Sequence, residues 1–171
     1  MKDLISIAFE PVNQPDVVAL IDALDAYQKP LYPAESYHGV DIDSLAQSNV
    51  LFAVARSATG VPVACGGILL ETDLGELKRM YTKPSHRGQG IARRILEALE
   101  SAAFARGCRR FALETGYRQA EAIALYERCG YRRCGPFGTY TEDPNSVFML
   151  KETPRLALSA EAPWNPPLTR P

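Results

Sequence analysis

The sequence predicts one α/β (α+β) domain in which helices flank a central sheet that is mixed and largely antiparallel. Three observations predict this fold class. The length of 171 residues fits a single domain. The first half of the chain holds several short apolar segments separated by turn residues, which is typical of antiparallel strands. The second half alternates such segments with two helical periodicities, and this order places helices against the sheet.

The N-terminal part is expected to form a strand, a helix and a long connection. Residues 5–9 are predicted to be the strand. Asn13 is a candidate cap for a helix that has Pro15 in its first turn, and this helix fades near Tyr27. The connection that follows is rich in proline, aromatic and acidic residues, with a short second helix predicted at 42–47. Long connections in compact domains are more often functional than short ones.

The middle of the chain predicts three strands and a helix. The strands are expected at residues 50–56, 63–71 and 74–81, and a turn at 57–60 joins the first two into a hairpin. Helical periodicity predicts a helix at 90–106. The apolar stripe of this helix consists of Ile91, Ile95, Ala98, Leu99 and Ala102.

The last part of the pattern predicts a strand, a helix and a final strand. The strands are expected at 110–114 and 147–151, and the helix at 119–129, with an extended segment beginning at Tyr131. Three residues of this helix recur at near-helical spacing: Ala122, Leu125 and Tyr126.

Composition excludes several classes of protein. Nineteen lysines and arginines against twenty acidic residues give a formal net charge of −1, which argues against a general nucleic-acid binder. The apolar run at the N-terminus is too short for a signal peptide, and nothing reaches membrane-spanning length. We therefore expect a cytoplasmic protein without a membrane partner. The four cysteines form no C-x-x-C pair, so reduced thiols and no metal site are expected.

The composition changes near the C-terminus. Residues 1–152 are predicted to form the domain, and 153–171 a proline-rich tail that holds the only tryptophan, Trp164. The tail either frays or docks on the domain or on a partner chain.

The loop at residues 87–92 is the most informative segment. It contains Arg87 and two glycines, follows Lys83 and His86, and lies where helix 90–106 begins. A helix start has backbone N–H groups without intrahelical partners and carries the positive end of the helix dipole. Glycines allow this backbone to approach a ligand closely. The loop therefore predicts a binding site for a phosphorylated cofactor.

Together with its neighbours, this loop resembles the GNAT superfamily of acetyl-CoA-dependent N-acetyltransferases. The resemblance is carried by the R-x-x-G-x-A run at 87–92, the preceding segment GELKRMYTKP, and the later ALYERCGY at 124–131, in the order and spacing of the family. It covers roughly residues 5–151. It implies a splayed pair of strands that admits the cofactor, and an enzyme that transfers acetyl groups from acetyl-CoA to an amine.

The resemblance also implies which residues bind coenzyme A. The pyrophosphate is expected on the loop backbone, and the pantetheine arm on the open edge of the preceding strand. Gln119 occupies the place where the family often has an asparagine that contacts this arm, so the contact keeps its amide but changes in length. The remaining residues implied by the motif are Met80, Tyr81, Thr82, Arg87, Gly88, Gln89, Gly90, Ile91 and Ala92.

Two catalytic roles follow from the resemblance and from the chemistry. Amine attack needs a neutral nucleophile, and the departing sulfur benefits from a proton. Tyr126 matches the tyrosine that often supplies this proton in the family, although its apolar neighbours also fit a core aromatic. Glu76 is the first candidate base, with a salt bridge to Lys78 as its alternative role. Glu114, on the next strand, is the second candidate.

The acceptor is expected to be a primary amine of a small molecule, attacked directly in a ternary complex. In the family the acceptor pocket is formed by the loop after the first helix and by the last hairpin. These segments offer aromatic walls with a few polar groups, as small-molecule sites require. Two alternative functions remain: a non-catalytic CoA-sensing or partner-binding module, and a protein lysine or N-terminal acetyltransferase. A homodimer is also possible. The candidate substrate residues are Tyr32, Glu35, Tyr37, Phe137 and Tyr140.

Overall fold

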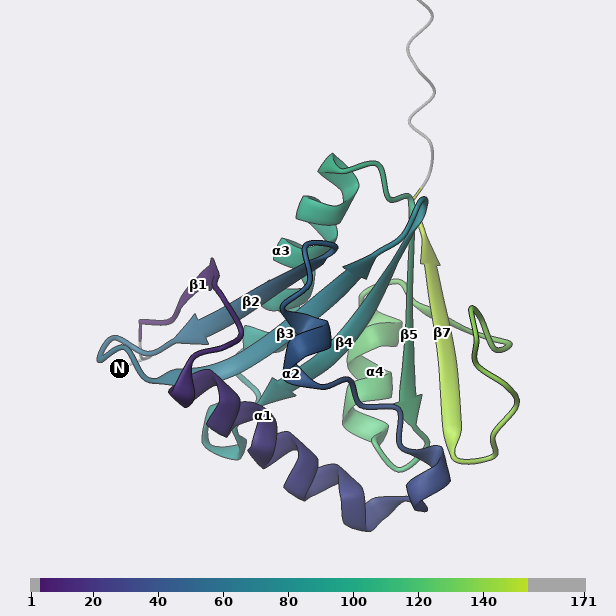
Figure 1. The fold of residues 1–171 in the computed structure, drawn as a ribbon, viewed down its shortest axis with the longest axis horizontal. Coiled ribbons are helices and arrows are strands. Elements are labelled where there is room, and N and C mark those ends of the chain that lie inside the picture. The colour runs from purple at the N-terminus through teal and green to yellow at the C-terminus, as the bar shows by residue number, and fades with distance from the viewer. Residues whose placement is uncertain (1–3, 154–171) are drawn as a thin grey trace, which may run out of the picture.

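The computed structural model describes residues 4–153 and consists of one sheet with helices on both faces (Figure 1). The seven strands run in the order β1-β2-β3-β4-β5-β7-β6. Every pairing is antiparallel except β4 with β5, so the sheet is mixed and largely antiparallel, as predicted. The elements are β1 Ser6–Phe9, α1 Pro15–Gln28, α2 Ile42–Leu45, β2 Val50–Arg56, β3 Pro62–Leu70, β4 Leu74–Thr82, α3 Ile91–Ala105, β5 Arg110–Gly116, α4 Ala120–Arg128, β6 Arg132–Cys134 and β7 Ser146–Glu152.

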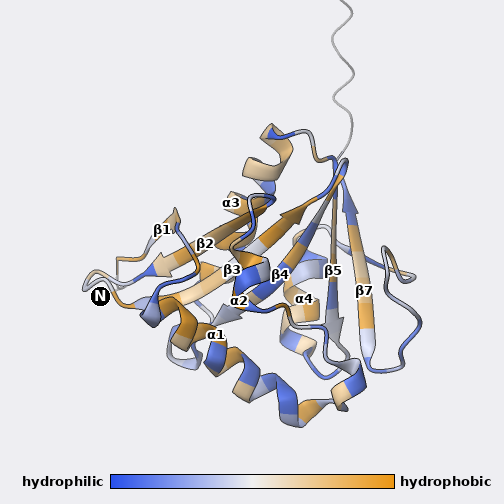
Figure 2. Cartoon of the chain, in the orientation of Figure 1, coloured by the Kyte–Doolittle hydropathy of each residue, from blue (hydrophilic) through white to orange (hydrophobic). Residues whose placement is uncertain are grey.

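The sheet separates two apolar cores. On one face α1 and α2 pack on β2 and β3, with Val17, Leu20 and Phe52 buried. On the other face α3 and α4 cover the centre of the sheet, where Leu99 and Phe111 are buried. Figure 2 shows the consequence in the colours: β2 and β3 are largely hydrophobic because both of their faces are covered, whereas α1 alternates between hydrophobic and hydrophilic residues.

The predicted elements are confirmed, with small shifts at their ends. The N-cap of α1 is Gln14 rather than Asn13, and its side chain makes no capping hydrogen bond. On α3 the buried stripe takes in Leu96 and Ala103, whereas Ala98 and Ala102 are only half-buried. The connection after α1 contains two 3₁₀ turns, Lys29–Leu31 and Ala34–Ser36, which periodicity did not reveal. Trp164 and the rest of the predicted tail beyond Thr153 lie outside the described residues.

The strands β4 and β5 separate partway along their length, as the resemblance implied. Their register covers only Leu74 to Glu76 on β4 and Arg110 to Ala112 on β5. Beyond these pairs the two strands diverge, and Figure 1 shows α4 crossing behind the gap. From Leu77 onward β4 thus has no strand partner on its β5 side.

The β4 strand also carries a bulge at its free part. Its register with β3 shifts between Cys65 and Gly67, which pair with Tyr81 and Lys78. Two residues of β4 therefore lie opposite Gly66 alone, which is the definition of a bulge.

In the described part of the chain no helix is long and apolar enough to cross a membrane.

Candidate active site

A long groove of about 1110 Å³ runs from the free part of β4 along the start of α3 to α4. We call it the long groove. Every residue that the resemblance assigned to coenzyme A lines it except Gln89, namely Met80, Tyr81, Thr82, Arg87, Gly88, Gly90, Ile91, Ala92 and Gln119.

The start of α3 is built to receive an anion. Gly88 and Gly90 have φ values of 73° and 77°, a left-handed conformation that glycine adopts without strain. Gly90 is the N-cap of α3 and offers no side-chain cap, and the first turn holds no acidic residue. Among residues 4–153, the N–H groups of this first turn therefore have no capping side chain and no acidic neighbour in the turn. A pyrophosphate in the groove would supply a negative partner.

Cationic side chains reinforce this end of the groove. Arg87 donates from Nε to the Thr82 carbonyl at 3.0 Å and lies against the rings of Tyr27 and Tyr81, 5.6 and 5.9 Å from their centroids. The lining also includes Arg93 in the first turn of α3, and Arg118 just before α4. The residues therefore fit a phosphorylated ligand in charge, in free donors and in space.

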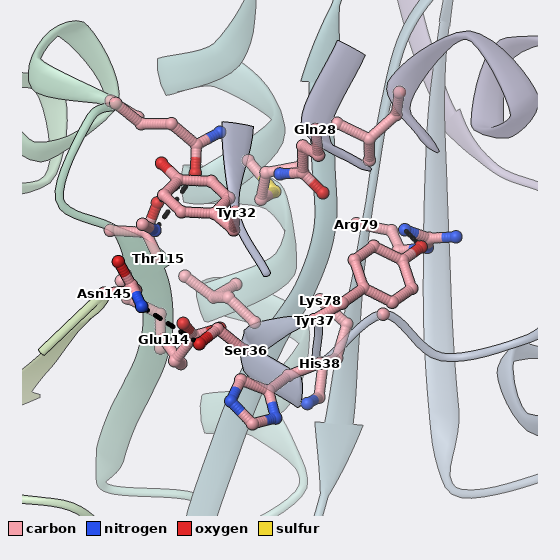
Figure 3. Close-up of a pocket in the computed structure, with 18 of the residues that line it drawn as sticks. Gln28, Tyr32, Ser36, Tyr37, His38, Lys78, Arg79, Glu114, Thr115 and Asn145 are labelled. Atoms are coloured by element: carbon pink, nitrogen blue, oxygen red, sulfur yellow. Dashed lines mark hydrogen bonds between the residues drawn. The ribbon is translucent and has the colours of Figure 1, made fainter. Parts of the chain in front are cut away.

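A second, smaller cavity of about 100 Å³ lies on the side of the sheet where the loop after α1 passes over β4 and β5. We call it the inner cavity. Figure 3 shows Tyr32, Tyr37 and His38 of this loop surrounding it together with Glu114 on β5 and Lys78 on β4.

The two cavities meet at the separation of β4 and β5. The residues that line both are Leu24, Met80, Gln119, Ala122 and Tyr126. A molecule extended along the long groove can therefore present its end group to a second molecule in the inner cavity.

Tyr126 lies at this junction with its ring in the core. The residue is 6% exposed, and its ring packs edge-on against Tyr131 at 5.8 Å between centroids. Within the described residues its hydroxyl has no hydrogen-bond partner. Burial raises the pKa of Tyr126, so the phenol keeps its proton. It is thus both the core aromatic and the candidate donor that the sequence left open.

The two candidate bases have different surroundings. Glu76 is bound by its neighbours: Lys78 Nζ lies 2.7 Å from its Oε1, and the Tyr140 hydroxyl donates to it at 2.6 Å. Glu76 lines neither cavity. Glu114 lines the inner cavity, and burial raises its pKa above the usual carboxyl value. The geometry therefore favours Glu114 as the group that faces an acceptor.

Gln119 has its amide oriented by β5. Its Oε1 accepts hydrogen bonds from the Thr115 hydroxyl at 2.9 Å and from the Gly116 N–H at 3.1 Å (Figure 3 shows Thr115). The oxygen is therefore occupied, whereas the amide nitrogen donates no hydrogen bond to the residues that the structure describes. A donor here suits a carbonyl of the pantetheine arm.

The predicted substrate residues divide into two groups. Tyr32, Tyr37 and Tyr140 line the inner cavity. Glu35 is exposed and lines neither cavity, and Phe137 packs instead against Tyr140 at 5.1 Å between ring centroids.

The sequence did not single out Asp25 and Lys78 as parts of the site. Asp25 binds the buried Arg79, and Lys78 lines the inner cavity beside Tyr140. Asp25 lies near the end of a helix where an exposed carboxylate is ordinary. Its role depends on a tertiary contact with β4, which no local pattern encodes. Arg79 lies within the predicted cofactor strand, but its sequence position gave no indication that its carboxylate partner is Asp25.

The splayed strands and the helix start without a negative partner are the features expected of an acyltransferase that uses a coenzyme A thioester. The family model described as Acetyltransferase (GNAT) family matches residues 18–131. The chain therefore belongs to the GNAT acetyltransferase family and is an N-acetyltransferase.

Relatives match most of the chain. The chain is 47% identical over 149 residues to an IAA acetyltransferase of Azospirillum brasilense, covering 86% of this chain and 97% of that one. It is 38% identical over 123 residues to the uncharacterized N-acetyltransferase YsnE of Bacillus subtilis, covering 70% of this chain and 81% of the relative. A crystal structure from Klebsiella pneumoniae, described provisionally as an acyl-CoA N-acyltransferase, matches with a TM-score of 0.74 at 39% identity, covering 87% and 97% of the two chains.

Proposed function

We propose that this N-acetyltransferase transfers the acetyl group of acetyl-CoA to the primary amine of a small molecule, by direct attack in a ternary complex. One observation carries the proposal: the long groove and the inner cavity meet at Met80 and Tyr126, where β4 and β5 separate. Two substrates can therefore be bound at once with their reactive ends together. Holding both in this way replaces a bimolecular encounter by an intramolecular step.

The donor side is organised by backbone groups. The loop from Arg87 to Ala92 holds the pyrophosphate, and the free edge of β4 from Met80 to Thr82 receives the pantetheine arm. When bound, acetyl-CoA supplies the activated acetyl group as its thioester. A backbone N–H near Met80 donates to the acetyl oxygen, and one such donor contributes about 10²–10³ in rate.

Glu114 acts as the base. An amine in water is mostly protonated, and the ammonium must lose a proton before it attacks. Glu114 faces the inner cavity and has a raised pKa, which brings its proton affinity closer to that of the amine. The removed proton passes to Glu114 Oε and then to solvent.

Tyr126 acts as the acid. The neutral nitrogen attacks the acetyl carbon, and it releases its second proton to solvent through Glu114 as the new C–N bond forms. The Tyr126 hydroxyl gives its proton to the departing sulfur as the C–S bond breaks, and then regains a proton from solvent. Counted from an ammonium acceptor, each turnover yields one amide, one thiol and one proton. The pKa of Tyr126 is raised, so the proton is present at neutral pH.

A small acceptor is supported by the size of the inner cavity and by a relative. About 100 Å³ corresponds to only a few water molecules, far below the volume of a drug-sized pocket. The walls come from Tyr32, Tyr37 and Tyr140, whose rings suit a compact organic group. The name of the 47% identical relative, IAA acetyltransferase, also supports a small molecule as acceptor.

The test is a thiol-release screen with acetyl-CoA and a panel of small amines, amino acids, polyamines and a lysine-containing peptide. We expect thiol release and an acetylated product of matching mass with at least one small amine, and no modification of the peptide. Acetyl-CoA binding with no thiol release for any acceptor would favour a CoA-sensing module. Acetylation of the peptide alone would favour a protein acetyltransferase.

A further inference from the structure

Arg79 has an unusual backbone conformation for its residue type. With φ at 56° it is the only non-glycine residue with a positive φ between residues 4 and 153. Such a conformation crowds the Cβ of any side chain against the backbone and persists only where the surroundings enforce it. Arg79 lies in the bulge of β4, immediately before Met80 at the junction of the two cavities.

The bulge decides which side of the sheet Met80 faces. Lys78 and Arg79 both point toward the α1 side, where they bind Glu76 and Asp25. Leu77 and Met80 belong to the core on the α3 side. In a regular strand, residues three positions apart face opposite sides of the sheet, so Met80 would face α1 and not the side of Leu77. The missing Cβ of Gly66 makes room for this arrangement, because a Cβ there would lie 2.2 Å from Met80 Sδ.

Three contacts hold Arg79 in this position. Its Nη1 lies 2.7 Å from Asp25 Oδ1 and donates to the Tyr37 hydroxyl at 3.0 Å, and Tyr37 in turn donates to Asp25 (Figure 3 shows Arg79 beside Tyr37). The Arg79 side chain is only 6% exposed. The Arg79 carbonyl accepts from Cys65 Sγ at 3.5 Å. Both ends of the residue are therefore fixed.

Burial alone would raise the pKa of Asp25, but the hydrogen bonds from Arg79 and Tyr37 outweigh it and leave that pKa below its ordinary value. Asp25 thus stays ionised at neutral pH and keeps its contact with the guanidinium.

We propose that Asp25 and Tyr37 are positioning residues for acyl transfer: they hold Arg79 in the left-handed conformation that keeps the bulge of β4 and places Met80 at the junction of the two cavities. The inference rests on the proposed function, because it assumes that Met80 contributes to the reacting geometry. Asp25 belongs to α1 and Tyr37 follows the second 3₁₀ turn, so both act on β4 from outside the sheet.

The kinetic test compares the parent with Asp25→Asn and Tyr37→Phe. We expect Asp25→Asn to lower kcat by about 10²-fold, the order of loss that a misplacement of about 1 Å produces, with the affinity for acetyl-CoA unchanged. Tyr37→Phe keeps the ion pair and is expected to lower kcat less. It also serves if Asp25→Asn fails to fold. A rise in the acceptor KM with kcat unchanged would show that the pair binds substrate instead, and would overturn the proposal.

A double-mutant cycle separates positioning from general stabilisation. Glycine adopts a φ of 56° without strain, so Arg79→Gly should keep the bulge without a clamp. Whatever kcat Arg79→Gly leaves, we expect Asp25→Asn to cause no further loss in that background, because no guanidinium then remains for Asp25 to hold. Additive losses in kcat would contradict the proposal.

Crystal structures of the parent and of Asp25→Asn test the conformation of Arg79 without any acceptor substrate. We expect the backbone at Arg79 to leave the left-handed region in the variant and the register of β4 against β3 to change. An unchanged φ and an unchanged bulge would overturn the proposal. If no amine supports turnover in the parent, the proposed function fails, while this structural comparison still decides whether Asp25 holds the bulge.

Discussion

Replacing Tyr126 by phenylalanine separates its chemical role from its packing role. The substitution removes only the hydroxyl and leaves the ring in its contact with Tyr131, 5.8 Å between centroids. Because that hydroxyl has no hydrogen-bond partner within residues 4–153, its loss should change the free energy of unfolding by less than about 1 kcal/mol. The proton that it supplies to the departing sulfur would be lost altogether.

The expected effect on turnover is much larger than the effect on stability. Loss of a general acid lowers kcat by about 10²–10⁴, which corresponds to roughly 3–5 kcal/mol in the activation free energy. The assay is thiol release at saturating concentrations of both substrates, with acetyl-CoA affinity measured by calorimetry and unfolding by denaturant titration. We expect a large fall in kcat with nearly unchanged affinity and stability.

Tyr131→Phe is the matched control. This neighbouring tyrosine is 2% exposed and donates to Glu100 Oε1 at 2.8 Å. Its hydroxyl bonds a charged group, so its removal should lower the free energy of unfolding by about 1.5–3 kcal/mol while kcat stays at the parent level. Equal kcat for parent and Tyr126→Phe would refute the assignment of Tyr126 as the acid. Equal losses of kcat in both variants would mean that packing, not proton transfer, explains the effect.

Three further predictions concern the base, the phosphate loop and a distant ion-pair cluster. In the parent, kcat/KM should fall as pH decreases through the pKa of Glu114, which burial has raised above 4.5. Glu114→Gln should remove this acidic limb from the pH profile of kcat/KM. An unchanged pH profile would exclude Glu114 as the base. Gly90→Ala should weaken acetyl-CoA binding, measured by calorimetry, because Gly90 lines the groove and its φ of 77° strains any residue with a Cβ. Gly107→Ala, at a φ of 98° beyond the far end of α3, should strain the backbone without affecting that binding. Arg56→Met should lower the free energy of unfolding by about 1–2 kcal/mol with kcat intact, since Arg56 binds Glu10 at 2.8 Å. The pKa of Glu10 is lowered mainly by its hydrogen bond with Arg56, so its contribution is present above pH 4.5 and lost as pH falls through the lowered value. A difference that persists well below that pH would contradict the assignment to Glu10.

The fold was predictable because its signals are local. The periodicity of α3 and the turn residues between β2 and β3 determine those elements, and the glycines at 88 and 90 indicate a helix start that binds an anion. The separation of β4 and β5 was predictable only from the family resemblance. The segment 74–82 reads as an ordinary strand by pattern, and nothing in its residues alone reveals where it loses its partner.

The inner cavity was predicted only in part, because it depends on contacts between distant segments. The loop after α1 was predicted to line the cavity because its aromatic residues follow neither a helical nor a strand periodicity, so the packing of a regular element does not explain them. The ranking of the two carboxylates was not accessible from sequence. Glu76 and Glu114 both lie on strands beside the cofactor segment, and only the structure shows that Lys78 and Tyr140 bind the first while the second faces the cavity.

If the junction of the two cavities brings acetyl-CoA and a small amine together, the acetyl group must reach that amine. Mass-spectrometric detection of the acetylated small amine, measured against thiol release in the same reaction, tests this most directly. We expect one acetylated amine for each thiol released, and loss of both products in Tyr126→Phe. Thiol release without an acetylated amine, or acetyl-CoA binding with neither product, would contradict this expectation.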